Sequence, residues 1–572
     1  GFQPLTDHTQ GTVVNADLIG FFCSPKSIVD MGCGASTTTN PQKVHPQNVG
    51  TCEGQLVVAE GTTANHFVHV VPTNTIADHP EPPAVFTEND ISDKILAARY
   101  EVRGTVPLRA NQLEAQLKNG EQLPFNRLIK CHIGNPQAVQ QKPITFYRQV
   151  ASALCNPSLL GQGIFPEDVE RRATAYISAT GNAGIGAYTD SRGIALVRQQ
   201  IAAFIERRDG FPADPDGIYL TSGASEAIGR CISMIVRDET VGIMVPCPQY
   251  PLYSATLTMV GGKLVSYRTF EENGWRTTQA ELEDCLKRAE TDGIRVRSIC
   301  VINPGNPAGT VLDADDIAMF INFAAAHKLV VLADEVYQSN VYAEDKQFVS
   351  FKKVLREQQA ENTQRCAESQ LISFHSTSKG IIGECGQRGG FMEVVGFNKE
   401  IAAVMQKVAA TNLSSCTLGQ CFMGLMVTPP LPGDPSNEMF RSETGDIFLG
   451  LQRRAKLLSE GLNSIPGISC NPIEGAMYAF PRVHIPEAAV KEAKNQNMEA
   501  DVFWCLGLVE ATGVVTVPGS GFGQDPGTYH FRTTILPPEE MLQDMVQHVA
   551  SFHSDFVALY GTSLHSRPAS RQ

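Results

Sequence analysis

The stretch "LISFHSTSKGIIGECGQRGGFMEVV", residues 371–395, holds two short apolar runs on either side of a glycine-rich polar turn. Similar runs occur in "GIYLTSG", "VGIMVPC", "SICVIN" and "LVVLADEVY", and several alternate with helical patterns such as "DADDIAMFINFAAAHK". In residues 191–208, Ile194, Val197, Ile201 and Ile205 have the spacing of a helix with one buried face. Strands that alternate with helices predict an α/β domain with a mainly parallel sheet.

The bulk composition narrows the class of protein. The chain has 572 residues, beyond the size at which one hydrophobic core stops growing, so at least two domains are expected. A net charge of −14 argues against nucleic acid as the main partner. The 15 cysteines include no CxxC pair, which argues against a disulfide framework or a metal cluster and favours a reducing compartment. No uncharged apolar run approaches the roughly 18 residues of a membrane span. We expect a protein of the cytoplasm or the mitochondrion, neither secreted nor in a membrane, that acts on small molecules.

The first 95 residues differ from the rest of the chain. They are acidic, contain many Thr, Asn and Pro residues, and show no sustained periodicity, so we predict a disordered extension at residues 1–95. A mitochondrial transit peptide would instead be rich in Arg and poor in acidic residues. We predict an N-terminal arm with part of a small domain at 96–165 and a large domain at 166–430. A C-terminal small domain at 431–562 and a flexible tail at 563–572 would follow.

Polar residues collect where the predicted strands end. Ser222, Asp334 and Ser376 each follow an apolar run, and Asn303 to Asn306 follow another. In open α/β sheets, ligands bind at the carboxyl ends of the strands. The sequence therefore predicts one site that is built from several strand ends.

Lys379 lies in the polar turn among residues that bind phosphate. A partly buried lysine near other cations becomes a nucleophile toward carbonyls. Ser376, Ser378 and Arg388 are phosphate-binding residue types, and the glycines between them let a ligand approach the backbone closely. A compound that carries both a carbonyl and a phosphate fits these features, and pyridoxal phosphate is the obvious candidate. The pattern S-x-S-K alone is weak and needs support from other segments.

Two segments after strands supply that support. Asp334 follows the buried run "LVVL", where an unpaired carboxylate is costly. It either caps the next turn or keeps a pyridine nitrogen protonated, and Tyr337 would then reach the phenolate oxygen of the same ring. Asn306 lies in the turn "INPGNPAGT". Such turns are usually only connections, but this one would aim an amide at that oxygen.

Three other segments offer groups for a phosphate, a ring and a carboxylate. "TSGASEAIG" opens a helix, so the backbone N–H groups of Ala224 and Ser225 would bind a phosphate. Tyr250 in "PQYPLYS" would stack on the cofactor ring, although an aromatic residue after a strand is more often part of the core. Arg532 in "TYHFRTTILPP" is either a solvated strand residue or a bidentate partner of a substrate carboxylate.

Taken together, these segments resemble the fold-type-I, pyridoxal-phosphate-dependent aminotransferases, and within that group the alanine aminotransferases. The likeness runs colinearly from about residue 96 to residue 560 and includes "CHIGNPQAVQQKPITFYRQV", "EGAMYAFPRV" and "VPGSGFG". It implies a large domain with a mainly parallel seven-stranded sheet flanked by helices, and a smaller α/β domain. The chain departs from the family pattern at Ala308, Ile381 and Gln387, none of which has an assigned catalytic role.

The resemblance also implies a role for each candidate residue. Lys379 is similar to the family's Schiff-base lysine and Asp334 to the partner of the pyridine nitrogen, and Tyr250 has the ring-stacking position. The groups around the ring oxygen match Asn306 and Tyr337, and the phosphate site matches Ala224, Ser225, Ser376, Ser378 and Arg388. Substrate would contact Gly134, Asn306 and Arg532. Tyr188 matches a tyrosine that reaches the phosphate of the neighbouring subunit, which implies a homodimer with shared active sites.

The implied reaction is a two-stage, ping-pong transamination. The amino group of L-alanine passes through the cofactor on Lys379 to 2-oxoglutarate, giving pyruvate and L-glutamate. A transaminase of the same subfamily that acts on glyoxylate with glutamate or alanine is the alternative. A pyridoxal-phosphate lyase of the same fold, such as an aminocyclopropane-carboxylate synthase, is a further alternative that shares the Asp, Lys and Arg residues.

Overall fold

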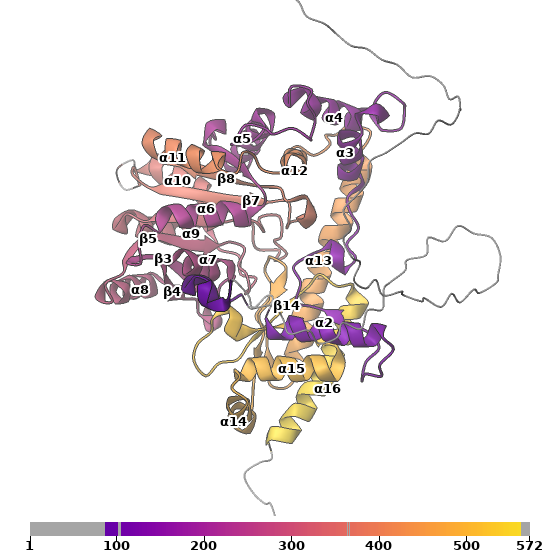
Figure 1. Ribbon diagram of the computed structural model, residues 1–572, viewed down its shortest axis with the longest axis vertical. Helices are drawn as coiled ribbons and strands as arrows, with labels where there is room; N and C mark the ends of the chain where they lie inside the picture. The colour runs from indigo at the N-terminus through magenta and orange to yellow at the C-terminus, as the bar shows by residue number, and fades with distance from the viewer. Residues whose placement is uncertain (1–85, 101–103, 363, 365, 562–572) are drawn as a thin grey trace, which may run out of the picture. The chain divides into compact units, whose positions relative to one another are not determined.

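Seven strands form the central sheet of the computed structural model, which describes residues 86–100, 104–362, 364 and 366–561 (Figure 1). The predictions of a disordered extension and a flexible tail therefore fall largely outside the described residues. The strands of this sheet are β2 (Ile218–Thr221), β3 (Val241–Cys247), β4 (Lys263–Arg268), β5 (Arg295–Ile302), β6 (Val330–Asp334), β7 (Gln370–Ser376) and β8 (Gly390–Val395).

The strand order across the sheet is β2-β8-β7-β6-β5-β3-β4. Strands β3 to β7 pair in parallel, and β8 runs antiparallel to both of its neighbours. The prediction of a mainly parallel, seven-stranded sheet is confirmed. The register pairs Asp334 with Ile302 on one side and with Phe374 on the other, so the carboxyl ends of β5, β6 and β7 lie close to one another.

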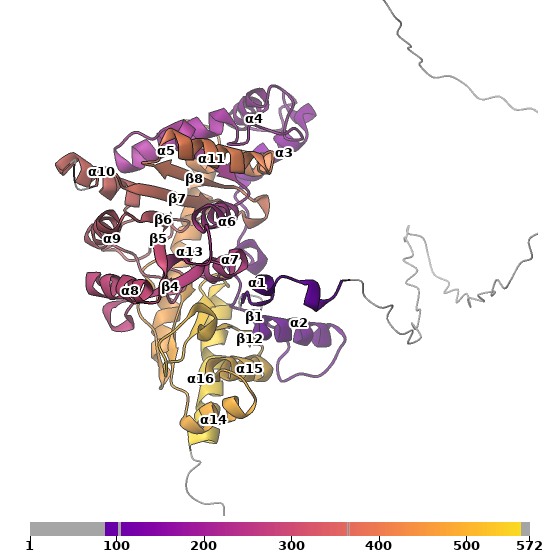
Figure 2. The ribbon, with the colours of Figure 1, turned by 60° about the vertical axis from the view of Figure 1, so that its left-hand side comes forward.

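Helices cover both faces of this sheet, because alternate residues of a strand point to opposite sides. In β6, Leu332 belongs to one buried cluster, whereas Val331 and Ala333 belong to another. Figure 2 shows the two helical layers on either side of the sheet. The layer on the side of Leu332 contains α6 (Ala224–Ile235), α7 (Leu252–Val260) and α11 (Lys399–Ala410), and the other contains α8 (Gln279–Thr291), α9 (Ala314–His327) and α10 (Phe351–Glu361).

Side-chain caps and glycines determine where helices begin and end. At the start of α9, the Asp313 carboxylate accepts the backbone N–H of Asp316 at 3.0 Å, and the Asp316 carboxylate accepts that of Asp313 at 3.3 Å, which forms a capping box. The predicted helix near residue 200 is α5 (Ala195–Asp209), with Val197, Ile201 and Ile205 buried. It ends at Gly210, whose φ of 78° is accessible to glycine at little cost.

A second group of elements surrounds three small sheets. The long helix α13 (Asn437–Asn463) leads from the large sheet to the C-terminal helices (Figure 1). Strand β1 (Ile129–Lys130) pairs with β12 (Val514–Val515), β9 (Ile468–Ser469) with β11 (Arg482–Val483), and the third sheet has the order β10-β14-β13. The remaining elements of this group are α2 (Thr105–Lys118), α13 (Asn437–Asn463), α14 (Glu487–Asn495), α15 (Ala500–Thr512), α16 (Glu539–Gly561), β10 (Tyr478–Ala479), β13 (Val517–Pro518) and β14 (Phe531–Thr534).

The predicted segment 96–165 is shared between these two groups. Its first part contains α2 and β1, which pack on α15 and β12. Its second part contains α3 (Thr145–Cys155), which packs with α4 (Glu167–Ala179) and α12 (Thr417–Val427) beside the large sheet. The division into domains stays a prediction.

Among the residues that the structure describes, no helix is both long and apolar enough to cross a bilayer. The other helices are α1 (Asp93–Leu96), α3 (Thr145–Cys155), α4 (Glu167–Ala179) and α12 (Thr417–Val427), with 3₁₀ turns at Glu88–Asp90, Gln137–Val139, Pro157–Leu159, Pro215–Gly217, Glu271–Asn273, Cys385–Gln387 and Gly519–Phe522.

The ion pair between Lys352 and Glu393 ties α10 to β8 and yields a stability prediction. Lys352 Nζ lies 2.6 Å from Glu393 Oε1, and the two side chains are 1% and 3% exposed. Replacing one partner of a buried pair leaves the other charge buried without a counter-ion. We therefore expect Lys352→Met to lower the free energy of unfolding by about 3 kcal/mol. Urea-induced unfolding measures this. The control is Lys353→Met, because Lys353 is 40% exposed and, within the described part of the chain, pairs only with the exposed Glu357, so its change should stay below about 1 kcal/mol. Equal losses in the two variants would contradict the prediction.

Candidate active site

A cavity of about 650 Å³ opens at the carboxyl ends of the large sheet's strands, where the sequence predicted a site. Every predicted site residue except Tyr188 lines it. They come from strand ends, from the N-terminus of α6, from the loop after β1 and from β14. These lining residues are Gly134, Ala224, Ser225, Tyr250, Asn306, Asp334, Tyr337, Ser376, Ser378, Lys379, Arg388 and Arg532.

The Lys379 amine lies at the junction of the two groups of elements. Lys379 follows β7, and its Nζ donates to the carbonyl oxygen of Gly134 at 2.7 Å. Gly134 belongs to the loop after β1. A Cβ at this position would overlap the Tyr478 hydroxyl and lie 2.9 Å from Lys379 Nζ. Glycine is therefore required at position 134 for the amine to enter the cavity from this direction.

Asp334 is a buried carboxylate without a cation. It is 4% exposed, and its Oδ2 accepts a hydrogen bond from the Tyr253 hydroxyl at 3.0 Å. Among the described residues, no Lys, Arg or His nitrogen lies within 4.0 Å of its oxygens to form an ion pair. Burial raises the pKa of Asp334 to about 6, although the hydrogen bond and the more distant charge of Lys379 partly oppose this. A ligand that brings a cation to this carboxylate would offset the cost of its burial.

Arg532 is the opposite case, a buried guanidinium without a carboxylate. It is 1% exposed, and within the described ranges no acidic side chain forms an ion pair with it. Its Nη1 donates to Asn306 Oδ1 at 3.3 Å and its Nη2 to the carbonyl oxygen of His132 at 3.0 Å. Its Nε is buried without a hydrogen-bond partner among those residues. A carboxylate ligand would satisfy both the charge and the remaining donors.

The opposite end of the cavity suits a phosphate. Arg388 has a φ of 55° and donates to the carbonyl oxygens of Cys385 and Ser222, both at 2.9 Å. Gly223, whose φ is 88°, gives the guanidinium room, because a Cβ there would overlap Arg388 Nη2. Helix α6 begins at Ala224 with its N-terminus at the cavity, and the first N–H groups of a helix attract anions.

The two predicted serines differ in this site. The Ser376 hydroxyl donates to the carbonyl oxygen of Gly389 at 3.1 Å and accepts the N–H of Ser378 at 2.9 Å, so it shapes the turn. The Ser378 oxygen accepts from Arg388 Nη1 at 3.5 Å, and its hydrogen is not used by any described residue. Since a phosphate oxygen needs donors, Ser378 is the better placed of the two in this arrangement.

The groups predicted to face a ring line the same cavity. Asn306 Nδ2 donates to the Tyr337 hydroxyl at 3.5 Å, and both residues are buried. The Tyr250 hydroxyl lies 2.8 Å from that of Tyr100. Tyr188, by contrast, lies outside the cavity and is 77% exposed, so its predicted contact with a second subunit stays a prediction.

Two tyrosines of the site were not predicted. Tyr253 donates to Asp334, and the Tyr478 hydroxyl lies 3.5 Å from Lys379 Nζ. For Tyr253 the only signal was its place in "PQYPLYS", three residues after Tyr250, and it lies in the first turn of α7, which begins at Leu252. For Tyr478 we find no signal in the apolar run "GAMYAF", since its partners are distant in the sequence.

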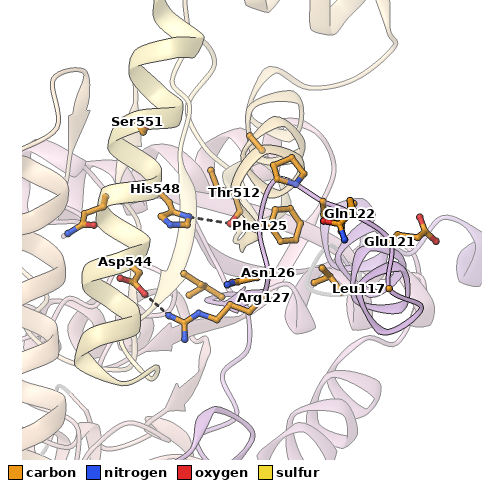
Figure 3. A pocket seen from close by; sticks show the side chains of 16 residues that line it. Leu117, Glu121, Gln122, Phe125, Asn126, Arg127, Thr512, Asp544, His548 and Ser551 are labelled. Carbon is orange, nitrogen blue, oxygen red and sulfur yellow. Dashed lines mark hydrogen bonds and ion pairs between the residues drawn. The ribbon is translucent and has the colours of Figure 1, made fainter.

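A larger cavity, of about 1090 Å³, lies between the end of α2, the end of α15 and α16 (Figure 3). Its charged side chains have partners: Arg127 pairs with Asp544 at 2.5 Å, and Glu121 accepts a hydrogen bond from the Gln116 amide. His548 is engaged with the carbonyl oxygen of Thr512. No described lysine or buried unpaired charge lines this cavity, so we place the chemistry in the smaller one.

Comparisons with known proteins point to one family. The family model for aminotransferase class I and II matches residues 157–549. Human alanine aminotransferase 1 is 45% identical over 480 residues, which cover 83% of this chain and 96% of the relative. Glutamate–glyoxylate aminotransferase 2 of Arabidopsis thaliana is 44% identical and covers 82% of this chain and 96% of its own length. Among solved structures, an alanine aminotransferase from Pyrococcus furiosus matches with a TM-score of 0.64 and 25% identity, covering 81% of this chain and all of the other.

The uncompensated charge of Asp334 generates a prediction for the ligand-free protein. Because burial raises its pKa from the usual 3.8 to about 6, its contribution to stability is fully present below pH 3.8 and is lost as the pH rises through 6. Asp334→Asn carries no charge, so its stability relative to the native protein should improve by about 2 kcal/mol between pH 4.5 and pH 8. Urea unfolding at the two pH values measures this.

Asp216→Asn is the control for that experiment. Asp216 is exposed, and its pKa is lowered by its hydrogen bond to Arg198 and the charge of Arg192, so its contribution has the opposite sign. Asp216→Asn should show no relative gain at pH 8. A gain in this control, or none for Asp334→Asn, would contradict the assignment of an unpaired charge at Asp334.

Proposed function

This chain belongs to the class I and II aminotransferase family, and from that premise we propose that it transfers the amino group of L-alanine to 2-oxoglutarate. The products are pyruvate and L-glutamate, and the reaction is reversible. One observation carries the proposal: among the described residues, the Lys379 amine enters a cavity that also holds a buried carboxylate without a cation and a buried guanidinium without an anion. A cofactor with a cationic ring and a substrate with a carboxylate would complete these two groups.

The members of this family use pyridoxal phosphate, and the residues of the cavity fit it. The unpaired carboxylate of Asp334 would hold a protonated ring nitrogen, while Asn306 and Tyr337 would face the ring oxygen and Tyr250 the ring. Its phosphate would bind the donors Ala224, Ser225, Ser378 and Arg388, with Ser376 behind them. When bound, pyridoxal phosphate supplies an aldehyde that takes up the amino group and a ring that withdraws electrons from the carbon being deprotonated.

The chain's own residues would then orient the substrate and move one proton. Arg532 would bind the α-carboxylate through its fork of donors, with Asn306 and the backbone of Gly134 beside it. Lys379 would hold the cofactor's aldehyde in the resting enzyme. When the substrate has taken its place, the free amine of Lys379 would stay close to the substrate Cα and would take the proton from that carbon. In the second stage Lys379 would return a proton to the Cα of the new amino acid.

A glyoxylate-directed transaminase remains the second candidate function. The Arabidopsis glutamate–glyoxylate aminotransferase and the human alanine aminotransferase are almost equally similar to this chain, at 44% and 45% identity. Steady-state rates with L-alanine or L-glutamate as donor, and with 2-oxoglutarate, pyruvate or glyoxylate as acceptor, decide between them. The proposal expects the largest kcat/KM for the pair L-alanine and 2-oxoglutarate. A larger value with glyoxylate would favour the second candidate.

We expect Arg532→Lys to weaken the binding of both substrates. The variant keeps a positive charge but loses the fork that matches a carboxylate, so KM for L-alanine and for 2-oxoglutarate should rise about 10- to 100-fold. Steady-state kinetics measure this. Arg454→Lys is the control, because Arg454 is half-buried and, among the described residues, donates only to the carbonyl oxygens of Gly450, Leu536 and Pro537. An unchanged KM for Arg532→Lys would exclude it as the carboxylate partner.

We further propose that the protein is a homodimer that works in the cytoplasm or the mitochondrion, with Tyr188 of each copy serving the other's phosphate site. Its exposure of 77% leaves Tyr188 accessible to a second copy. Co-expression of Lys379→Ala and Tyr188→Ala chains with different tags tests this. At limiting cofactor each variant alone should be nearly inactive, whereas the mixed dimer should contain one complete site and regain activity. If Tyr188 acts within its own chain, mixing restores nothing.

A further inference from the structure

Tyr478 has no part in the proposed function so far, yet it contacts two of its groups. It lies in β10, whose Tyr478 and Ala479 pair with Thr534 and Thr533 of β14, the strand that carries Arg532. Its hydroxyl is 3.5 Å from Lys379 Nζ, and its ring centre is 4.3 Å from the guanidinium carbon of Arg532. One buried side chain thus links the amine at the end of β7 to the guanidinium of the small sheet.

The backbone at Gly134 fixes this arrangement from a third direction. The Gly134 carbonyl accepts from Lys379 Nζ at 2.7 Å, and the missing Cβ at this position leaves the space that the Tyr478 hydroxyl fills. Tyr337 packs edge-on against the Tyr478 ring, with 6.1 Å between the ring centres. Tyr478 is 3% exposed, so its position is set by packing.

The two partners of the Lys379 amine differ in their chemistry. A carbonyl oxygen such as that of Gly134 can only accept a hydrogen bond, whereas a tyrosine hydroxyl can both donate and accept. During a proton transfer, the Lys379 amine changes between a neutral form with a lone pair and an ammonium form with three N–H groups. By rotating its O–H, Tyr478 can donate to the first form and accept from the second.

We propose that Tyr478 is a further catalytic residue, whose hydroxyl holds the Lys379 amine in both of its protonation states and whose ring holds Arg532 in place. The inference rests on the proposed function, because it assigns Tyr478 to the same proton transfer at the substrate Cα. No covalent bond to Tyr478 forms or breaks. The proton moves between Cα and Lys379 Nζ, and the hydroxyl only exchanges a donated hydrogen bond for an accepted one.

The electrostatics of the site agree with this contact. Burial alone would raise the pKa of Tyr478, but the positive charges of Lys379 and Arg532 outweigh burial and lower that pKa below its usual value of 10.0. For Tyr337, burial and the neighbouring Tyr478 raise the pKa well above that value, and burial raises that of Tyr250. Tyr478 should therefore ionise before these two neighbours in the ligand-free protein.

Ultraviolet titration of the ligand-free protein tests the contact without any catalysis. The native protein should show a tyrosine that ionises at lower pH than the others. Tyr478→Phe should remove that component, and Lys379→Ala should move it to higher pH, because the nearest charge is gone. Identical titration curves for the native protein and Tyr478→Phe would overturn the inference. So would a curve that Lys379→Ala leaves unchanged.

The cofactor-loaded enzyme provides the second readout. Tyr478→Phe keeps the ring over Arg532, so it should lower kcat about 10- to 100-fold while KM for L-alanine changes less than about threefold. Tyr478→Leu also loses the ring and should raise KM about tenfold in addition. Tyr342→Phe is the matched control. Its buried hydroxyl donates to the carbonyl oxygen of Ala476 at 2.7 Å and does not line the cavity, so its kinetics should remain native.

The outcomes separate the inference from the function on which it rests. A native enzyme that does not use L-alanine refutes the proposed function, and the ligand-free titration still decides whether Tyr478 senses Lys379. If the native enzyme is active and Tyr478→Phe has a native kcat, the inference fails and the proposed function stands. A low kcat in both Tyr478→Phe and Tyr342→Phe also overturns it, because the loss would then reflect any buried hydroxyl in this region.

Discussion

The structure depends on two opposite charges, Asp334 and Arg532, that are buried in one cavity and form no ion pair with each other. Asp334 has no cation and Arg532 has no anion among the described residues, although both are almost fully buried. Leaving a charge unpaired in the interior costs several kcal/mol, so a fold keeps such groups where a ligand completes them. The two charges, with Lys379 in the same cavity, define a site for a ligand that is cationic at one end and anionic at the other.

The architecture explains how these groups come together. The level ends of β5, β6 and β7 bring Asn306, Asp334 and Lys379 to one edge of the large sheet. Arg532 arrives from β14 of a separate small sheet, and hydrogen bonds to Asn306 and to the loop after β1 hold it there. Glycines at 134 and 223 provide the space for the cationic side chains. The cavity is therefore a product of two groups of elements, and neither contains a complete site.

The parallel sheet and most residues of the site were predictable from the sequence. Apolar runs locate the ends of the strands, and the carboxyl ends of parallel strands share one edge of the sheet. Strand ends and the adjoining polar turn are enough to predict that Asp334, Asn306 and Lys379 belong to one site. This reasoning did not find Tyr478, whose contacts with Lys379 and Arg532 depend on how the small sheet packs on the large one. Nor did it separate Ser376 from Ser378, since the direction of each hydroxyl follows from the backbone of the turn. Residue types are visible in a sequence, but the orientation of side chains across two sheets is not.

The most direct test of the account is the visible absorbance of the purified protein loaded with pyridoxal phosphate, titrated with L-alanine and then with 2-oxoglutarate. The account predicts that the band of the bound cofactor disappears on addition of L-alanine and returns on addition of 2-oxoglutarate, which demonstrates both stages in one sample. A protein that takes up no pyridoxal phosphate, or a band that L-alanine leaves unchanged, would contradict it.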